Sequence, residues 1–267
     1  MKSILELSDL KGRRALVTGA NGQLGRVFCE TLAELGANLI LVDLPDSDFE
    51  SNKSNLWNRW GTEVECYPSD LEDESARAKL VGDFARSQRG LNILVNNAAF
   101  VGSSLLDGWN EPFEKQSLET WRRAFELNLT ATFDLCKNLY PILKISEGAN
   151  IVNIASIYGS YGPDWRIYHG TNLNNPAAYA ASKGGLIQLT RWLSTTMTPH
   201  VRVNAISPGG IRDTQQIEFV KAYEAKTPLG RMGKPQDIKG AMSFLASDLS
   251  EYVTGHILEV NGGWGVW

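Results

Sequence analysis

The chain has 267 residues, of which 43% are hydrophobic and 21% charged, as is ordinary for a globular protein with a sizeable core. Its formal net charge of −4 argues against nucleic acid or an anionic membrane surface as partner. No apolar run reaches transmembrane length. The cysteines Cys29, Cys66 and Cys136 are widely spaced, which predicts reduced thiols in a cytoplasmic protein rather than disulfides or a metal site.

Short apolar runs alternate with longer amphipathic stretches, a pattern typical of βαβ units around a parallel sheet. The predicted strands are Ala15–Thr18, Leu39–Asp43, Glu63–Tyr67, Ile93–Asn96, Asn150–Ala155, Arg202–Ile206 and Ile257–Val260. Helices are predicted to begin near Gln23, Glu72, Thr120, Pro176, Gln216 and Pro235. Because no linker or repeat interrupts this pattern, we expect one α/β domain over residues 1–267. Its core would be a doubly wound, seven-stranded parallel sheet with helices on both faces.

The first predicted strand runs into a glycine-rich turn, Thr18–Gly25, which is followed by helical sequence. A strand–turn–helix of this kind lets the backbone approach a diphosphate, whose charge is stabilised at the helix N-terminus. The second predicted strand ends at Asp43, 18 residues after Gly25. A carboxylate there accepts hydrogen bonds from ribose hydroxyls and repels a 2′-phosphate. We therefore expect NAD, rather than NADP, as the cofactor.

Tyr179 and Lys183 lie four residues apart in helical sequence, so their side chains share one helix face. A phenol with a pKa near ~10 is a poor base at neutral pH, and a neighbouring cation lowers that pKa. The pair is thus a candidate for proton transfer to or from an alcohol. The spacing alone is more often that of a solvated pair, so its meaning depends on the surrounding motifs.

Together these motifs resemble the one-domain branch of the short-chain dehydrogenase/reductase family over essentially the whole chain. The segments that carry the resemblance are Thr18–Gly25, Asp70-Leu71, Asn96–Ala99, Asn128, Ser156, Tyr179 with Lys183, Pro208–Gly210 and Tyr252–Gly263. The resemblance implies an enzyme that transfers a hydride between nicotinamide and a secondary alcohol or ketone.

The resemblance also implies roles for individual residues. Tyr179 would exchange the proton and Ser156 would bind the reacting oxygen. Lys183 would bind the ribose and lower the tyrosine pKa, while Asn128 would hold a water near the lysine. The implied cofactor-binding residues are Gly19, Asn21, Gln23, Leu24, Gly25, Asp43, Asp70, Leu71, Asn97, Ala98, Ala99, Tyr179, Lys183, Pro208, Gly209, Ile211 and Thr214.

The glycine-rich turn departs from the one-domain branch, which usually has glycine at the position of Gln23; here the glycine stands one residue earlier, at Gly22. The spacing of Gly19, Gly22 and Gly25 resembles the extended branch, which contains sugar-nucleotide epimerases and dehydratases. That branch needs a separate C-terminal substrate region, for which no residues remain. The chain length and the motifs Asn96–Ala99 and Pro208–Gly210 therefore favour the one-domain branch. We expect Gln23 to cap the diphosphate through its backbone amide.

A 22-residue stretch, Ile157–Ala178, lies between Ser156 and Tyr179 and is rich in aromatic and hydrogen-bonding side chains. It leaves the carboxyl end of a predicted strand, where ligands bind in open α/β sheets. It is predicted either to bind the substrate or to cover the cofactor, and residues 211–227 are predicted to form a lid over the same pocket. The candidate substrate-binding residues are Tyr158, Arg166, His169 and Asn175.

This stretch and the tryptophan-ended tail resemble oxidoreductases of flagellin modification and nonulosonic-acid synthesis, which implies a sugar or amino-sugar substrate. The alternatives are a 3-oxoacyl or other hydrophobic carbonyl reductase, a sugar-nucleotide epimerase, and a NAD-sensing protein without turnover. The family resemblance further implies a homotetramer, or at least a homodimer. Trp267 is expected either in a subunit interface or in the core.

Overall fold

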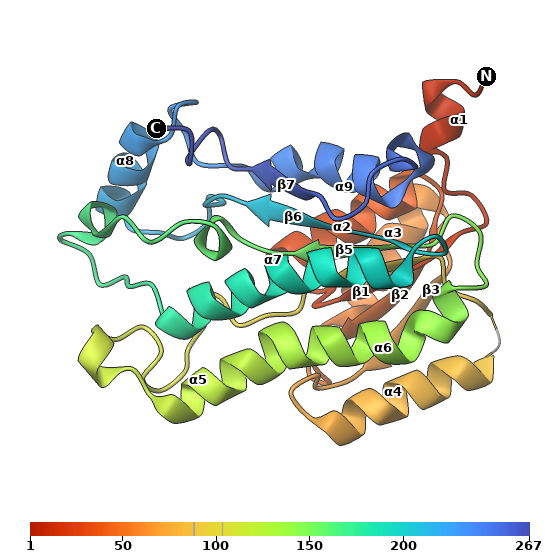
Figure 1. The fold of residues 1–267 in the computed structure, drawn as a ribbon, viewed down its shortest axis with the longest axis horizontal. Coiled ribbons are helices and arrows are strands. Elements are labelled where there is room, and N and C mark those ends of the chain that lie inside the picture. Colours follow the sequence, from red (N-terminus) through yellow and green to blue (C-terminus); the bar gives the residue numbers. More distant parts are fainter. Residues whose placement is uncertain (88, 103) are drawn as a thin grey trace.

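The computed structural model describes residues 1–87, 89–102 and 104–267. Its centre is one seven-stranded parallel sheet in the order β3-β2-β1-β4-β5-β6-β7 (Figure 1). The strands are β1 (Arg14–Thr18), β2 (Asn38–Asp43), β3 (Val64–Pro68), β4 (Ile93–Asn96), β5 (Asn150–Ile154), β6 (Arg202–Pro208) and β7 (Ile257–Val260). The predicted fold class is confirmed, and every predicted strand is present with its ends shifted by two residues at most.

Helices cover both faces of the sheet (Figure 1). One layer contains α2 (Gln23–Glu34), α3 (Phe49–Trp60) and α9 (Lys239–Ala246). The other layer contains α4 (Glu74–Ser87), α5 (Leu118–Phe125), α6 (Ala131–Leu143) and α7 (Ala177–Met197). The helices α1 (Ile4–Ser8) and α8 (Ile217–Lys226) lie at opposite ends of the molecule, near the N-terminus and the C-terminus respectively.

Six short helical turns complete the part of the chain that the structure describes. Five are 3₁₀ turns: η1 (Phe113–Lys115), η3 (Ile157–Gly159), η4 (Trp165–Tyr168), η5 (Pro235–Ile238) and η6 (Asp248–Ser250). The sixth, η2 (Glu126–Thr130), is a π-helical segment between α5 and α6.

The strands read as continuous apolar runs because both faces of the sheet are buried. In β1, Ala15 and Val17 belong to the hydrophobic core on the α2 side, whereas Leu16 belongs to the core on the opposite side. This alternation along each strand fixes which side chains meet which helical layer. All strand side chains of β1 are fully or almost fully buried.

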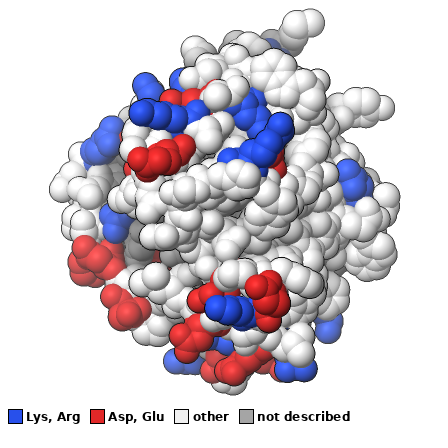
Figure 2. All heavy atoms as spheres, turned by 90° about the vertical axis from the view of Figure 1, so that its left-hand side faces the viewer, with Lys and Arg blue, Asp and Glu red and all other residues white. Residues whose placement is uncertain are grey.

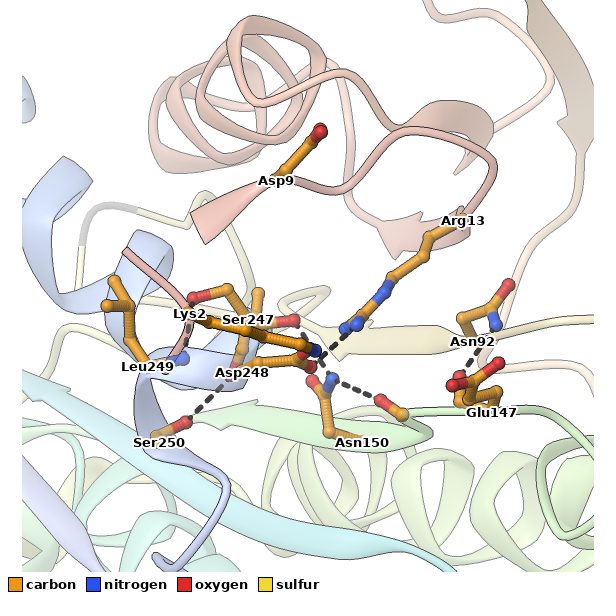
Figure 3. Close-up of polar contacts among 12 residues, drawn as sticks. Lys2, Asp9, Arg13, Asn92, Glu147, Asn150, Ser247, Asp248, Leu249 and Ser250 are labelled. Atoms are coloured by element: carbon orange, nitrogen blue, oxygen red, sulfur yellow. Dashed lines mark hydrogen bonds and ion pairs between the residues drawn. The ribbon is translucent and has the colours of Figure 1, made fainter. Parts of the chain in front are cut away.

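At the amino ends of the strands, polar contacts join segments that are distant in sequence (Figure 3). Asp248 accepts hydrogen bonds from Arg13 Nη2 at 2.6 Å and from Lys2 Nζ at 3.4 Å. Asn150 Nδ2 donates to the carbonyl oxygens of Gly148 and Ala246 at 3.2 and 3.0 Å. These contacts hold the N-terminal segment and η6 together at the amino ends of the strands. The glycine-rich turn and Tyr179 lie at the other end.

Candidate active site

A cavity of about 900 Å³ lies along the carboxyl ends of the strands. It is lined both by the glycine-rich turn and by the predicted catalytic residues Ser156, Tyr179 and Lys183. The lining also includes most of the predicted cofactor-binding residues: Gly19, Gln23, Leu24, Gly25, Asp43, Asp70, Leu71, Asn97, Ala98, Ala99, Pro208, Gly209 and Ile211. The fold thus brings residues from the first and the last third of the chain to one site.

The glycine-rich turn is too tightly packed to admit side chains at two of its three glycines. Gly19 has a φ of +60°, and a Cβ on Gly25 would lie 1.9 Å from the carbonyl oxygen of Gly19. A Cβ on Gly22 would meet the same oxygen at 3.4 Å, which is an ordinary contact. The turn therefore depends on Gly19 and Gly25, and it presents backbone N–H groups at the start of α2, as a bound diphosphate requires.

Besides the backbone amide expected to bind the diphosphate, Gln23 makes a contact through its side chain. Its Nε2 atom donates to the carbonyl oxygen of Arg212 at 3.3 Å. This bond ties the first turn of α2 to the segment that follows β6.

Asp43 lies at the end of β2 with its carboxylate at the cavity. It accepts hydrogen bonds from the backbone N–H groups of Asn21 and Leu44, at 2.7 and 2.8 Å, and from the Ser47 hydroxyl at 2.9 Å. These three bonds fix the carboxylate and join the glycine-rich turn to the loop after β2. Ionised carboxylates have about four acceptor positions, so capacity remains for a ligand hydroxyl.

The end of β4 is joined to the end of β1 by side-chain hydrogen bonds. Asn97 Nδ2 donates to the carbonyl oxygens of Thr18 and Gly19, both at 2.9 Å. In return, Thr18 Oγ1 accepts the N–H groups of Asn97 and Ala98 at 2.9 and 3.0 Å. Asn97 therefore ties neighbouring backbone, and the small side chains of Ala98 and Ala99 line the cavity.

Tyr179 and Lys183 share one face of α7, as the spacing predicts, with Nζ 5.9 Å from the centroid of the tyrosine ring. Lys183 Nζ donates to the carbonyl oxygen of Ile154 at 2.7 Å. Burial lowers the pKa of the Lys183 ammonium to about 8, because the charged form loses its hydration.

The pKa of Tyr179 is raised and not lowered in this structure. Burial is the main cause, and a hydrogen bond with Ser156 only partly opposes it, while nearby Tyr168 raises the pKa further. The net direction is opposite to the one expected from Lys183, because burial disfavours the charged phenolate. That Lys183 lowers the pKa of Tyr179 stays a prediction.

Asn128 is buried in the π-helical segment η2, where it links three segments. Its Oδ1 accepts from the Phe100 N–H at 2.8 Å, and its Nδ2 donates to the Phe100 carbonyl and to Ser182 Oγ at 3.2 and 3.1 Å. Its side chain thus holds the loop after β4 against α7 and does not line the cavity. π-Helical segments are frequent at functional sites, but the sequence carried no signal for this one.

The stretch 157–178 contributes only some of its predicted residues to the cavity. Tyr158 and Asn175 line it, whereas Arg166 and His169 do not. His169 is exposed, and the Arg166 guanidinium pairs with Asp164 at the surface. The prediction that Arg166 and His169 face the substrate pocket is therefore wrong, because η4 turns both outward.

Residues that the sequence did not single out complete this end of the cavity. Most are aromatic or apolar (Tyr168, Leu173, Phe219, Tyr223 and Met232), and polar lining comes from Asn174, Asp213 and Gln215. Each comes from the 157–178 stretch or from residues 211–232, so the aromatic content of the loop was the one signal that pointed to them. Of the remaining predicted cofactor-binding residues, Asn21 and Thr214 do not line the cavity.

The segment predicted as a lid forms a packed wall in this structure. Phe219 and Tyr223 of α8 share a hydrophobic cluster with Trp264 of the C-terminal tail. Lys226, in the last turn of α8, pairs with Asp164 at 2.8 Å. The Tyr223 hydroxyl accepts the Gly210 N–H at 2.5 Å, so the same wall supports the turn after β6.

Trp264 and Trp267, both in the C-terminal tail, differ in how far their side chains are buried. Trp264 is buried and stacks on Tyr223 with ring centroids 4.2 Å apart. Trp267 is 74% exposed, and its indole N–H donates to the Lys226 carbonyl at 3.0 Å. Trp267 is therefore not a core residue, and its place in a subunit interface stays a prediction.

Among the described residues, no cluster of His, Cys, Asp and Glu is arranged to hold a metal ion. Within residues 1–87, 89–102 and 104–267, no helix is long and apolar enough to cross a membrane.

The fold is that of a doubly wound α/β protein. Its cavity, at the carboxyl ends of the strands, is lined both by a glycine-rich turn of the dinucleotide-binding type and by Tyr179 and Lys183. A family model described as enoyl-(acyl carrier protein) reductase matches residues 19–265. The 3-oxoacyl-[acyl-carrier-protein] reductase of Aquifex aeolicus is 30% identical over 95% of this chain and 98% of its own. The chain belongs to the short-chain dehydrogenase/reductase family, whose members bind NAD or NADP.

Two solved structures illustrate the range of cofactors among relatives. A short-chain dehydrogenase of Leptospira borgpetersenii with bound NAD⁺ has a TM-score of 0.83 and 32% identity, covering 99% of this chain and 96% of that chain. The Pseudomonas aeruginosa RhlG/NADP complex also has a TM-score of 0.83, with 27% identity, covering 97% of this chain and 98% of that chain. The protein is thus an oxidoreductase of this family, and family membership leaves the choice between NAD and NADP open.

Proposed function

We propose that this protein is a NAD(H)-dependent oxidoreductase that interconverts a ketone and a secondary alcohol. The observation that carries the proposal is that Ser156, Tyr179 and Lys183 line the same cavity as the glycine-rich turn. A bound nicotinamide cofactor supplies or accepts the hydride, and every other step falls to the side chains of this chain.

In the direction of reduction, Tyr179 donates its phenolic proton to the oxygen of the forming alcohol. Ser156 hydrogen-bonds the same oxygen and stabilises its developing negative charge. The raised pKa of Tyr179 keeps the phenol protonated at neutral pH, which is the form that reduction requires. Lys183 lies one helical turn away with its ammonium directed at the end of β5, where it can meet ribose hydroxyls.

The site fits NAD better than NADP. The cavity lining at the ends of β2 and β3 carries three carboxylates, Asp43, Asp70 and Glu72, which repel a 2′-phosphate. The cation nearest to them in the described lining, Arg123, is held by Glu72 through bonds of 2.6 and 2.9 Å. Titration with NADH and NADPH, followed by tryptophan fluorescence, is expected to give tighter binding of NADH, and tighter binding of NADPH would overturn this choice.

The substrate end of the cavity favours an uncharged carbonyl compound over a charged sugar derivative. Its walls are largely aromatic and apolar, its carboxylate, Asp213, would repel an anionic group, and Arg166, which could have met a phosphate or carboxylate, lies outside. The centre of the face at the carboxyl ends of the strands is largely uncharged, with Lys, Arg, Asp and Glu toward its margins (Figure 2). The Aquifex relative is a 3-oxoacyl reductase by name, so we place a hydrophobic carbonyl substrate ahead of the sugar class that the sequence suggested.

The proposal is tested by NADH oxidation with a panel of ketones, keto esters, sugars and nucleotide sugars. Tyr179→Phe is expected to lose a factor of roughly 10² to 10⁴ in kcat while it still binds NADH. Near-normal turnover by this variant would refute the assignment of the proton donor. A wild-type protein that binds NADH and turns over no panel member would instead support the NAD-sensing alternative.

The predicted assembly state has partial support. Trp192 on α7 and Phe133 on α6 are exposed in the single chain, as a subunit interface would require. We therefore keep the homodimer or homotetramer as a proposal, which sedimentation velocity tests directly.

A further inference from the structure

Two tyrosines that line the cavity bring their hydroxyl groups together. Tyr158 lies two residues after Ser156, and Tyr168 ends η4; their hydroxyl oxygens are 2.7 Å apart. Both side chains line the cavity. Asn175, which is 5% exposed, places its Nδ2 3.4 Å from the Tyr168 oxygen, and its Oδ1 has no partner among the described residues.

The hydrogen atoms of this cluster outnumber its acceptors. The two hydroxyls carry two hydrogens, and the bond between them uses one. With Asn175 donating to Tyr168, the second hydroxyl hydrogen has no acceptor among the side chains that the structure describes. Rotating the amide makes Tyr168 the donor to Oδ1, and the amide N–H₂ then becomes the surplus donor. In either orientation the cluster has a donor to spare.

The cluster is rigid and remains neutral at physiological pH. The Tyr168 ring packs on Phe219 and Trp165, with centroid distances of 5.4 and 5.7 Å. Burial is the main cause that raises the pKa of Tyr158 and of Tyr168, so both phenols keep their protons. The surplus hydrogen is thus presented from a fixed position.

We propose that the Tyr158–Tyr168–Asn175 cluster binds a second acceptor oxygen of the substrate, besides the carbonyl that is reduced. The inference rests on the proposed function and narrows its substrate class to ketones with a further carbonyl, ester or hydroxyl oxygen. Tyr158, Tyr168 and Asn175 all come from the 157–178 stretch, and all three line the cavity. Simple monofunctional ketones leave the surplus donor unpaired and are poorer substrates.

The test compares ethyl acetoacetate with 2-heptanone, which has the same chain length and lacks the ester oxygens. The readout is the ratio of their kcat/KM values, relative to the same ratio in the wild type, so that the intrinsic reactivity of the two ketones cancels. Tyr168→Phe and Tyr158→Phe are expected to lower this ratio by roughly tenfold to 100-fold, mainly through KM of the ester. A ratio unchanged in both variants would overturn the inference.

Tyr161→Phe is the matched control. Tyr161 lies on the same loop, but its hydroxyl meets Glu259 at 3.1 Å, and it does not line the cavity. The ratio is expected to stay at the wild-type value in this variant. A general loosening of the loop would lower both kcat/KM values together and leave the ratio unmoved.

A binding measurement separates failure of the inference from failure of the proposed function. The Kd of ethyl acetoacetate for the Tyr179→Phe variant with NADH bound is followed by protein fluorescence and needs no turnover. The additional change Tyr168→Phe is expected to weaken this Kd by roughly tenfold or more. Equal affinity with and without Tyr168 refutes the cluster, whereas binding without turnover in the wild type refutes the proposed reaction.

Discussion

Gly25→Ala tests the glycine-rich turn most directly, because the structure leaves no room for a methyl group there. The new Cβ would lie 1.9 Å from the Gly19 carbonyl oxygen, whereas such contacts essentially never fall below 3.0 Å. The turn and the first turn of α2 must therefore separate by about 1.1 Å, the difference between these two distances. Overpacking of this kind costs about 1–3 kcal/mol of unfolding free energy.

The displacement also moves the backbone N–H groups that would bind the cofactor diphosphate. A misplacement of about 1 Å in a binding site can cost roughly 10²-fold in function, so we expect the Kd for NADH to rise by about that factor. NADH fluorescence titration measures the Kd, and thermal unfolding measures the stability. Binding with wild-type affinity at an unchanged Tm would refute the reasoning from the 1.9 Å contact.

Gly22→Ala serves as the matched control for this variant. Gly22 has a φ of −69°, which any residue adopts, and its Cβ would meet only the Gly19 carbonyl oxygen at 3.4 Å. Alanine is a poorer N-cap than glycine, at a cost of at most about 1 kcal/mol. We expect NADH affinity near that of the wild type, and a large loss of affinity would show that the turn depends on all three of its glycines.

Three further predictions concern stability. Lys183 has a lowered pKa of about 8 against an ordinary 10.5, so the unfolded chain binds more protons between these values. Its contribution to the unfolding free energy therefore rises with pH across that window. In urea melts at a series of pH values, Lys183→Met is expected to reduce the slope of the unfolding free energy against pH. An unchanged slope would contradict this expectation. Arg77→Met removes a buried guanidinium that pairs with Glu126 at 2.8 Å and with Asp134 at 2.9 Å, both of them partly exposed. A loss of about 1.5–3 kcal/mol is expected from urea melts, against no change if the two pairs are dispensable. Trp264→Ala is expected to lose about 3–5 kcal/mol and to weaken NADH binding through Tyr223, and a stable variant with normal affinity would show that the tail does not support the wall.

Much of the fold was predictable from sequence because its signals are local. The strands are buried on both faces and therefore read as apolar runs, and Gly19, with a φ of +60°, marks the turn directly after the first of them. The helix α3 was not predicted, because Phe49–Trp60 is largely polar and weakly amphipathic. The sequence signals that could have indicated this helix are the residues at its two ends. Asp48 caps the N-terminus, and Gly61 ends the helix at the C-terminus with a φ of +66°.

The sequence by itself determined the sheet, the glycine-rich turn and the pairing of Tyr179 with Lys183. These depend on residue spacing within one strand, turn or helix, so the chain encodes them locally. Only the tertiary structure decided that Tyr168 faces the cavity while Arg166 faces solvent, because the direction of a side chain in an irregular loop depends on what packs against it. The pKa of Tyr179 was decided in the same way. The main cause of the raised pKa is burial, which several distant segments create together. The spacing of residues along the chain therefore cannot predict it.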